Sequence, residues 1–139
     1  MKSFRFVGIA LTLLLAVAAV QAQSLRMRAA IPFDFYINGT ALPAGNYEVN
    51  RLEPGVAIVM SSFENKASVA FLATSATSPR TASKSKLVFT RYGNQYFLSE
   101  IWVAGSDTGR KLPKSKEELR WAMTQPQEAS QVTLYAELR

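Results

Sequence analysis

Apolar and polar residues alternate along most of the chain, a pattern typical of β-strands with one buried face. In residues 31–38 the alternate positions carry Ile31, Phe33, Phe35 and Ile37. Similar alternation occurs in residues 47–52, 67–73 and 131–138. Residues 56–60 are apolar at every position, which indicates a strand in the middle of a sheet. The pattern therefore predicts a mainly β protein.

Turn sequences separate the predicted strands. Asn38-Gly39 and Gly93-Asn94 are two-residue pairs that tolerate positive φ, so each predicts a tight hairpin. Pro43-Ala44-Gly45 predicts a further turn, because proline presets its own φ and glycine accepts the left-handed conformation. Residues 74–86 are rich in Ser and Thr and predict an exposed loop.

The hairpin at Gly93-Asn94 has a register that its turn defines. Arg91 lies opposite Tyr96, and continued pairing places Leu87 opposite Glu100. One face then carries Leu87, Phe89, Arg91, Tyr96, Leu98, Glu100 and Trp102, and the other Val88, Thr90, Phe97, Ser99, Ile101 and Val103. Because both faces are substantially apolar, we expect both to be covered. A buried Glu100 would need a partner, and Arg91 on the same face is the expected one; a general acid with a raised pKa is the alternative.

A capping box, Ser115-Lys116-Glu117-Glu118, predicts a short helix from Lys116 to about Thr124. This helix is the one internal element available to cover the second hairpin face, through Leu119 and either Trp121 or Met123. If it does not, that face is expected to bind a partner subunit or ligand. The predicted fold is all-β, an antiparallel β-sandwich or small barrel of about seven to eight strands with one short C-terminal helix.

The N-terminal segment has the three parts of a secretory signal peptide. Lys2 and Arg5 precede a charge-free apolar run from Val7 to Val20, and Ala22 ends a typical cleavage site. As a helix the run would extend about 21 Å, less than the ~30 Å of a bilayer core, so cleavage is favoured over a membrane anchor. We expect a signal peptide at 1–22, a single β-rich domain at 23–139 with no transmembrane span, and a periplasmic or extracellular location of a bacterial protein.

The composition removes several classes of chemistry. The 139 residues include no Cys and no His. Without these residues the chain lacks disulfides, thiolate nucleophiles, imidazole bases and the usual zinc ligands. The sequence therefore predicts no enzyme activity, no catalytic residues, no cofactor and no metal site.

Four stretches resemble a family of small exported proteins predicted in Acidobacteria. They are Ile31-Pro32-Phe33-Asp34-Phe35, Leu42-Pro43-Ala44-Gly45-Asn46-Tyr47, Leu87 to Gly93, and Tyr96-Phe97-Leu98-Ser99 continuing through Trp102 to the segment from Gly105 to Arg110. The resemblance spans most of residues 23–139. It implies export and a shared fold, but it implies no activity and no catalytic residues, because no activity is assigned to the family.

Two polar features are candidates for binding. Residues 80–120 hold nine basic and four acidic residues, which favours an anionic partner or serves solubility alone. Gly105-Ser106-Asp107-Thr108-Gly109-Arg110 has hydroxyl and carboxylate groups between glycines, although a plain turn is the simpler interpretation.

The aromatic residues near the hairpins suit a glycan or a protein interface, and Tyr36 and Tyr92 stand next to turns. We expect an exported non-catalytic module that binds an envelope component, glycan or protein partner. Nucleic acid is not an expected partner of an exported protein. The alternatives are a small carrier of an apolar ligand and, after it, an enzyme that works without His or Cys. The tentative binding surface consists of Tyr92, Phe97, Ile101, Asp107 and Arg110.

Overall fold

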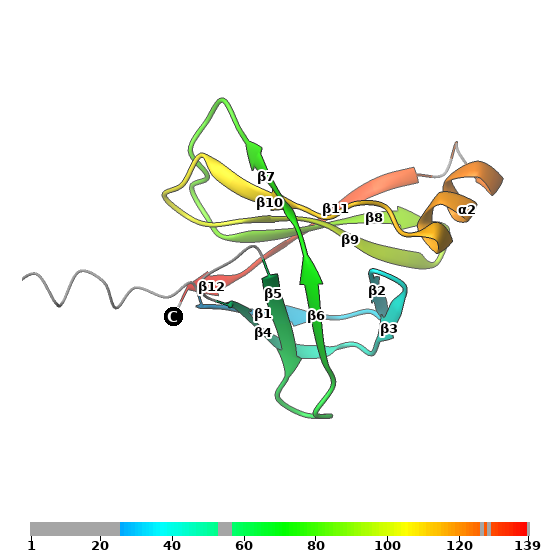
Figure 1. Ribbon diagram of the computed structural model, residues 1–139, viewed down its shortest axis with the longest axis horizontal. Coiled ribbons are helices and arrows are strands. Elements are labelled where there is room, and N and C mark those ends of the chain that lie inside the picture. The colour runs from blue at the N-terminus through cyan, green and yellow to red at the C-terminus, as the bar shows by residue number, and fades with distance from the viewer. Residues whose placement is uncertain (1–25, 53–56, 126, 128, 139) are drawn as a thin grey trace, which may run out of the picture.

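Two β-sheets lie one above the other in the computed structural model, which describes residues 26–52, 57–125, 127 and 129–138 (Figure 1). The predicted signal peptide, residues 1–22, lies outside the described residues. The first sheet has the order β12 (Glu137–Leu138), β1 (Arg26–Ile31), β4 (Gly45–Arg51), β5 (Ala57–Ser62) and β6 (Ser68–Leu72). The second has the order β11 (Ala129–Tyr135), β8 (Lys86–Tyr92), β9 (Gln95–Trp102), β10 (Thr108–Lys111) and β7 (Thr74–Thr77).

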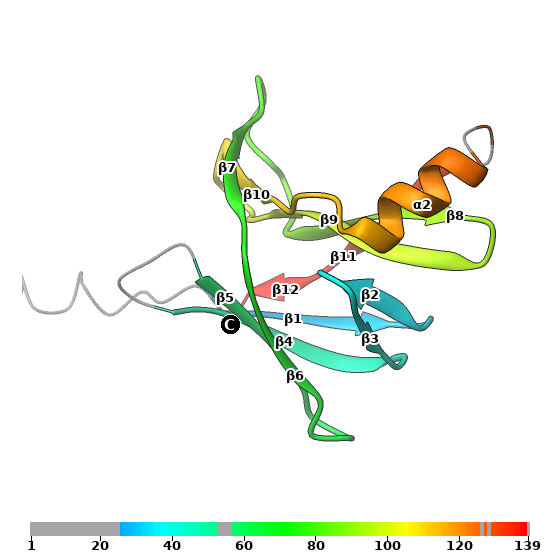
Figure 2. The ribbon, with the colours of Figure 1, turned by 45° about the vertical axis from the view of Figure 1, so that its right-hand side comes forward.

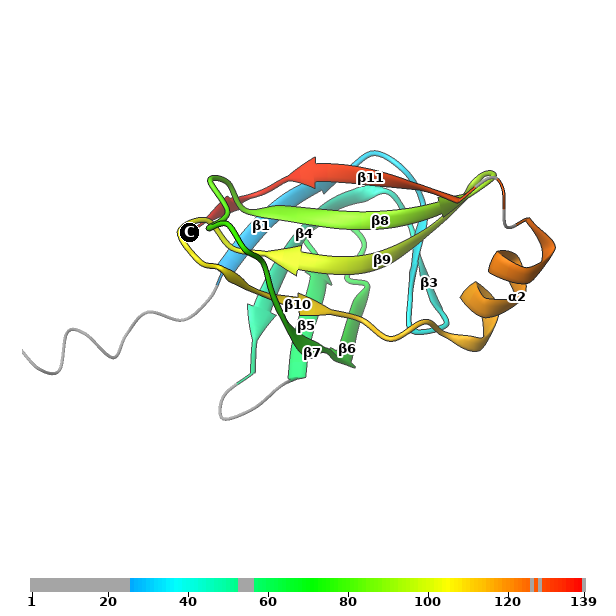
Figure 3. The same ribbon diagram turned by 90° about the horizontal axis from the view of Figure 1, so that it is seen from above.

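A short hairpin and one helix complete the arrangement. Strands β2 (Phe35–Ile37) and β3 (Thr40–Leu42) pair with each other, and β2 joins the second sheet beside Phe97 of β9. Helix α2 (Lys116–Thr124) stands at one end of the second sheet, as Figures 2 and 3 show. The main strand order of each sheet runs from one edge strand to another, and the β2–β3 hairpin branches from β9, so the described strands form two open sheets and not a closed barrel. The predicted mainly β, mostly antiparallel class with a short helix near the C-terminus is confirmed.

Two predicted strands are each divided between the two sheets. The alternating segment 31–38 is interrupted after Ile31, and the chain passes to the second sheet before Phe35. Pro32 stands at this crossing, where its missing N–H costs no ladder hydrogen bond. The C-terminal segment is likewise split at Ala136, whose N–H donates to the Ser85 carbonyl. The alternation therefore predicted correctly which side chains face the core, but it did not predict that each segment divides into two strands.

The two predicted hairpins are present. Asn38 and Gly39 both have positive φ, 47° and 82°, between the paired residues Ile37 and Thr40. Gly93 joins β8 to β9 with a φ of 61°. The apolar run near residue 58 is β5, which lies between two strands as predicted. The predicted loop 74–86 is wrong at its start, because β7 pairs along its length with β10.

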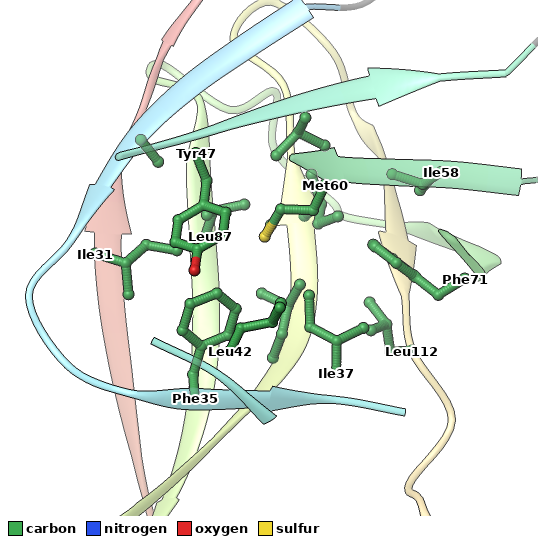
Figure 4. Close-up of a cluster of buried hydrophobic side chains, with 14 of the residues drawn as sticks. Ile31, Phe35, Ile37, Leu42, Tyr47, Ile58, Met60, Phe71, Leu87 and Leu112 are labelled. Carbon is green, nitrogen blue, oxygen red and sulfur yellow. The ribbon is translucent and has the colours of Figure 1, made fainter. Parts of the chain in front are cut away.

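The space between the sheets is filled by apolar side chains (Figure 4). Tyr47 is fully buried, and its hydroxyl donates a 2.5 Å hydrogen bond to the Pro43 carbonyl. The Phe35 ring meets the rings of Tyr47 and Phe89 edge to face, with centroids 5.2 and 5.6 Å away. A partly buried Phe33 extends this cluster by stacking on Tyr96 at 3.8 Å. These contacts join strands from both sheets in one core.

A β-bulge changes the predicted register of the second hairpin. Phe89 pairs with Leu98 as predicted, but Val88 then pairs with Glu100, so Ser99 is an extra residue. Beyond the bulge every side chain of β9 changes face relative to the prediction. Ile101 enters the core between the sheets, and Trp102 lies on the outer face with Val88. The bulge thereby keeps the Glu100 carboxylate out of the apolar core, where its desolvation would be costly.

Candidate functional site

Helix α2 is placed by a polar residue. The Ser115 hydroxyl caps it by accepting a 3.2 Å hydrogen bond from the Glu118 N–H, so the helix begins where the predicted capping box placed it, while the Glu118 carboxyl accepts from Tyr92. Glu118 itself is the buried helix residue, with 4% of its surface exposed. Leu119 is 48% exposed and Met123 84% exposed. The expectation that Leu119 covers the outer face of the hairpin is therefore wrong, because the helix turns its Glu118 side toward the sheet.

The outer face is covered by its own aromatic residues instead. The Trp102 indole lies across Gly109, where an added Cβ would stand 2.5 Å from the ring. Its Nε1–H donates a 2.7 Å hydrogen bond to Glu100 Oε2. Further along the face, the Tyr36 ring stacks on Phe97 with centroids 5.1 Å apart. Glycine at position 109 is thus required by the close approach of the indole.

On one side of α2, an aromatic cleft opens with a volume of about 430 Å³. We call it the aromatic cleft; it is lined by Tyr36, Gln95, Glu117, Arg120, Trp121 and Thr124. Trp121 comes from the helix and Tyr36 from β2, and both rings are partly exposed. Stacking on the buried Phe97 holds the Tyr36 ring in place. The cleft therefore combines two aromatic rings with amide, carboxylate, guanidinium and hydroxyl groups.

On the other side of α2 lies a second cavity of about 370 Å³, which we call the polar pocket. Its floor is the outer face of β8 and β9, and its walls are the start of α2, the segment 111–114 and the start of β11. The groups that define it are Thr90, Tyr92, Glu100, Lys111, Lys114 and Glu118. Among the described residues, the aromatic cleft and the polar pocket have no lining residue in common.

The pKa values of two groups in the polar pocket, Glu118 and Tyr92, are shifted. Burial raises the pKa of its carboxyl group, while the Lys114 ammonium and a hydrogen bond from Tyr92 act in the opposite direction. The bond from the Tyr92 hydroxyl to Glu118 Oε1 is long, at 3.4 Å. Burial, followed by the nearby Glu118 carboxyl, also raises the pKa of Tyr92. The pocket therefore holds a desolvated carboxyl group that the protein satisfies only in part.

The tentative binding surface is not assembled as one exposed surface. Tyr92 and Phe97 are buried on the outer face, and Ile101 belongs to the core between the sheets. Of these five residues, Tyr92 alone lines one of the two cavities. Asp107 is exposed in the turn just before β10. Arg110, within β10, donates a 2.8 Å hydrogen bond to the Ser75 hydroxyl.

The expected pairing of Arg91 with Glu100 is wrong. The Arg91 side chain is exposed, donates to the Gly93 carbonyl at 2.6 Å and lies 5.5 Å from the Tyr96 ring centroid. The bulge at Ser99 has moved Glu100 to the opposite face, where Trp102 supplies its hydrogen bond. In the described ranges, one ion pair is present, between Arg28 and Glu48 at 3.6 Å.

The segment 105–110 is a turn that leads into a strand, in agreement with the simpler interpretation. Gly105 has a φ of 82°, and the Ser106 hydroxyl accepts a hydrogen bond from the Thr108 N–H. Thr108 and Gly109 then belong to β10. In the part of the chain that the structure describes, there is no group of three or more acidic, His or Cys residues that would hold a metal ion.

Sequence reasoning missed Glu118, Glu117 and Arg120 as site residues, and it considered Trp121 only as a core contact. The capping box identified where the helix begins, but no sequence signal showed which face would meet the sheet. A tryptophan among charged neighbours in a short helix, Arg120-Trp121, was the available signal for an exposed aromatic site.

Comparison with known proteins does not identify a relative: the chain matches no family model, no curated protein and no solved structure. The resemblance to exported acidobacterial proteins thus stays a prediction. Across the described ranges, no helix has the length and apolar character needed to cross a membrane.

Proposed function

We propose that this protein is an exported, non-catalytic β-module that binds a glycan in the aromatic cleft. The observation that carries the proposal is that Trp121 and Tyr36 both line one cleft of about 430 Å³. Sugar rings pack their apolar faces on aromatic rings and satisfy their hydroxyl groups with polar side chains. Gln95, Glu117 and Arg120 supply donors and acceptors beside the two rings.

The position of the rings supports this proposal over a role in folding alone. The Tyr36 ring already has one aromatic neighbour, Phe97, and still lines the cleft. Trp121 lies on the only described helix, whose apolar residues Leu119 and Met123 point into solvent. A tryptophan at this position can contact a ligand over a large area, and it loses little side-chain entropy on binding.

The direct test is titration with soluble oligosaccharides of N-acetylglucosamine and of glucose, followed by tryptophan fluorescence. Trp102 is 9% exposed, so Trp121 will dominate any change on ligand binding. We expect saturable quenching by at least one series. Binding measured by calorimetry should weaken at least about tenfold in Trp121→Ala and in Tyr36→Ala.

The matched control is Tyr135→Ala, which removes an aromatic ring that is 66% exposed and lies outside the cleft. This variant should bind as the parent does. Two results would refute the proposal. One is an equal loss of affinity in Tyr135→Ala and Trp121→Ala, and the other is that the protein binds neither oligosaccharide series nor insoluble cell-wall polysaccharide.

An apolar carrier is less well supported. Seventeen buried residues form a continuous cluster between the sheets, and the largest of them have no exposed surface. The cavities flanking α2 are instead lined by charged and hydroxyl groups. A carrier would need an apolar cavity large enough to enclose most of its ligand.

Export rests on the N-terminal sequence alone. The apolar run Val7 to Val20 and the Val20-Gln21-Ala22 site support removal of residues 1–22. Mass spectrometry of the protein from its native host should find an N-terminus near Gln23. A soluble cytoplasmic form that retains Met1 would contradict export without bearing on the glycan site.

A further inference from the structure

The polar pocket has a charge arrangement of its own, separate from the aromatic cleft. Two carboxyl groups, of Glu118 and Glu100, lie inward, where Glu118 is 4% exposed and Glu100 is partly buried. Two ammonium groups, of Lys111 and Lys114, belong to exposed residues that line the same cavity. The pocket is therefore neutral in sum but acidic inside and basic at its rim.

Hydrogen bonds position the inner groups. Glu100 accepts a 2.7 Å hydrogen bond from the Trp102 indole, which Gly109 allows to lie flat. The Thr90 and Ser99 hydroxyls form a hydrogen bond of 2.5 Å with each other. Glu118 is positioned by the first turn of α2 and by the Tyr92 hydroxyl at 3.4 Å. Acceptors that are already oriented favour binding, because less side-chain entropy is lost when a ligand arrives.

Glu118 is the buried ionisable acid of the pocket. A buried carboxylate normally has a cationic partner or several hydrogen bonds. Here the protein supplies one long hydrogen bond and the field of Lys114, which stands on the exposed rim. A ligand ammonium group would supply the missing charge and hydrogen-bond donors together.

From this geometry we infer that the polar pocket is a second binding site, which takes a zwitterionic amino compound of about dipeptide size. Its ammonium group lies between Glu118 and Glu100, and its carboxylate lies toward Lys111 and Lys114. The cavity of about 370 Å³ exceeds a single small amino acid and falls at the lower end of ligand pockets. The site does not depend on the proposed glycan site, because the two share no residue.

Calorimetric titration of the purified protein with alanyl-alanine tests the inference. We expect saturable binding by alanyl-alanine and a loss of at least about tenfold for its N-acetylated form, which lacks the ammonium group. The C-terminal amide, which lacks the carboxylate, should lose less, because Lys111 and Lys114 are exposed and their charges are screened.

Variants assign the binding to the pocket. Glu118→Gln should weaken alanyl-alanine binding at least about tenfold, and Glu117→Gln, one residue earlier on the aromatic-cleft side, should not change it. If Glu118→Gln does not fold, Glu100→Gln and Lys114→Ala decide the question, and both should weaken binding. Trp121→Ala should bind alanyl-alanine normally.

Three results would overturn the inference. They are no detectable binding of alanyl-alanine, equal binding of the acetylated form, and equal losses in Glu117→Gln and in the pocket variants. A loss of glycan binding with retained dipeptide binding would refute the aromatic cleft alone, so the two proposals fail separately.

Discussion

On the inner face of the β8–β9 hairpin, Leu87, Phe89 and Ile101 pack against the opposing sheet in one continuous cluster. On the outer face, individual side chains cover the aromatic rings instead. Phe97 contacts the rings of Tyr36 and Tyr92, and the Trp102 indole lies flat against Gly109. The inner face is covered by a whole sheet, and its buried side chains belong to one cluster. A face covered by single side chains and one short helix leaves cavities between them, and both candidate sites lie there.

The difference also concerns chemistry. The buried residues of the inner face, Leu87, Phe89 and Ile101, carry apolar side chains that join one core cluster. The outer face mixes aromatic rings with Thr90, Glu100 and Glu118. Stability of the molecule should therefore depend mainly on the inner face, and binding mainly on the outer one.

The largest expected effect is on the inner face. Phe89 has no exposed surface and meets both Phe33 and Phe35 edge to face. Phe89→Ala should lower the free energy of unfolding by about 3–5 kcal/mol, through lost burial and a residual cavity. Urea unfolding followed by circular dichroism measures it. A loss below about 1 kcal/mol would show that this face is not the core.

A second prediction concerns the coverage of the outer face. In Gly109→Ala the new Cβ would lie 2.5 Å from the Trp102 ring, so the indole must move. We expect a loss of about 1–3 kcal/mol, typical of overpacking. The cost should shrink when Trp102 is also replaced by alanine, because the clash then disappears. Additive losses in this double-mutant cycle would contradict the contact.

A third prediction uses the titration of Glu118. Because burial raises the pKa of this carboxyl group, the folded protein binds the proton more tightly than the unfolded chain does. The stabilising contribution of the protonated form is complete below the ordinary pKa of a Glu side chain and is lost as pH rises through the raised pKa. Tyr92 and Lys114 are the groups that act on Glu118, and Glu100 and Lys111 line the same pocket.

The measurement compares unfolding of the parent and Glu118→Gln at about pH 4 and about pH 8, on either side of the ordinary range for carboxyl groups. The parent should lose stability relative to the variant at the higher pH. Glu117→Gln is the control, and it should follow the parent at both values. If the parent instead gained stability relative to Glu118→Gln as the pH rises, the pKa of Glu118 would be lowered in the folded protein and not raised.

The smallest effect is expected for Leu119→Ala. Leu119 is 48% exposed, so its truncation should cost less than about 1 kcal/mol, in contrast to the core contact that the sequence suggested. Urea unfolding of Leu119→Ala and Phe89→Ala under the same conditions compares the two losses in free energy of unfolding directly. A cost comparable to that of Phe89→Ala would mean that the helix packs its apolar side on the sheet after all.

Local sequence patterns were sufficient for the class of fold, the hairpin at Asn38-Gly39 and the start of the helix at Ser115. Each of these depends on interactions within a few residues: alternation of side chains, positive φ at Asn38 and Gly39, and a hydroxyl that caps the Glu118 N–H. The buried alternate positions Ile31, Phe35 and Ile37 were likewise readable, because burial requires apolar side chains wherever the strand goes.

Tertiary structure decided everything that depended on which strand or face meets which. The chain changes sheets at Pro32 and again at Ala136, and neither local pattern indicates a change of partner. The extra residue Ser99 places Ile101 in the core and Glu100 outside it, because a buried carboxylate costs more than an irregular ladder. In helix α2 the outcome is the reverse: Glu118 is buried beside Tyr92 and Leu119 lies in solvent, an orientation that no local pattern indicated.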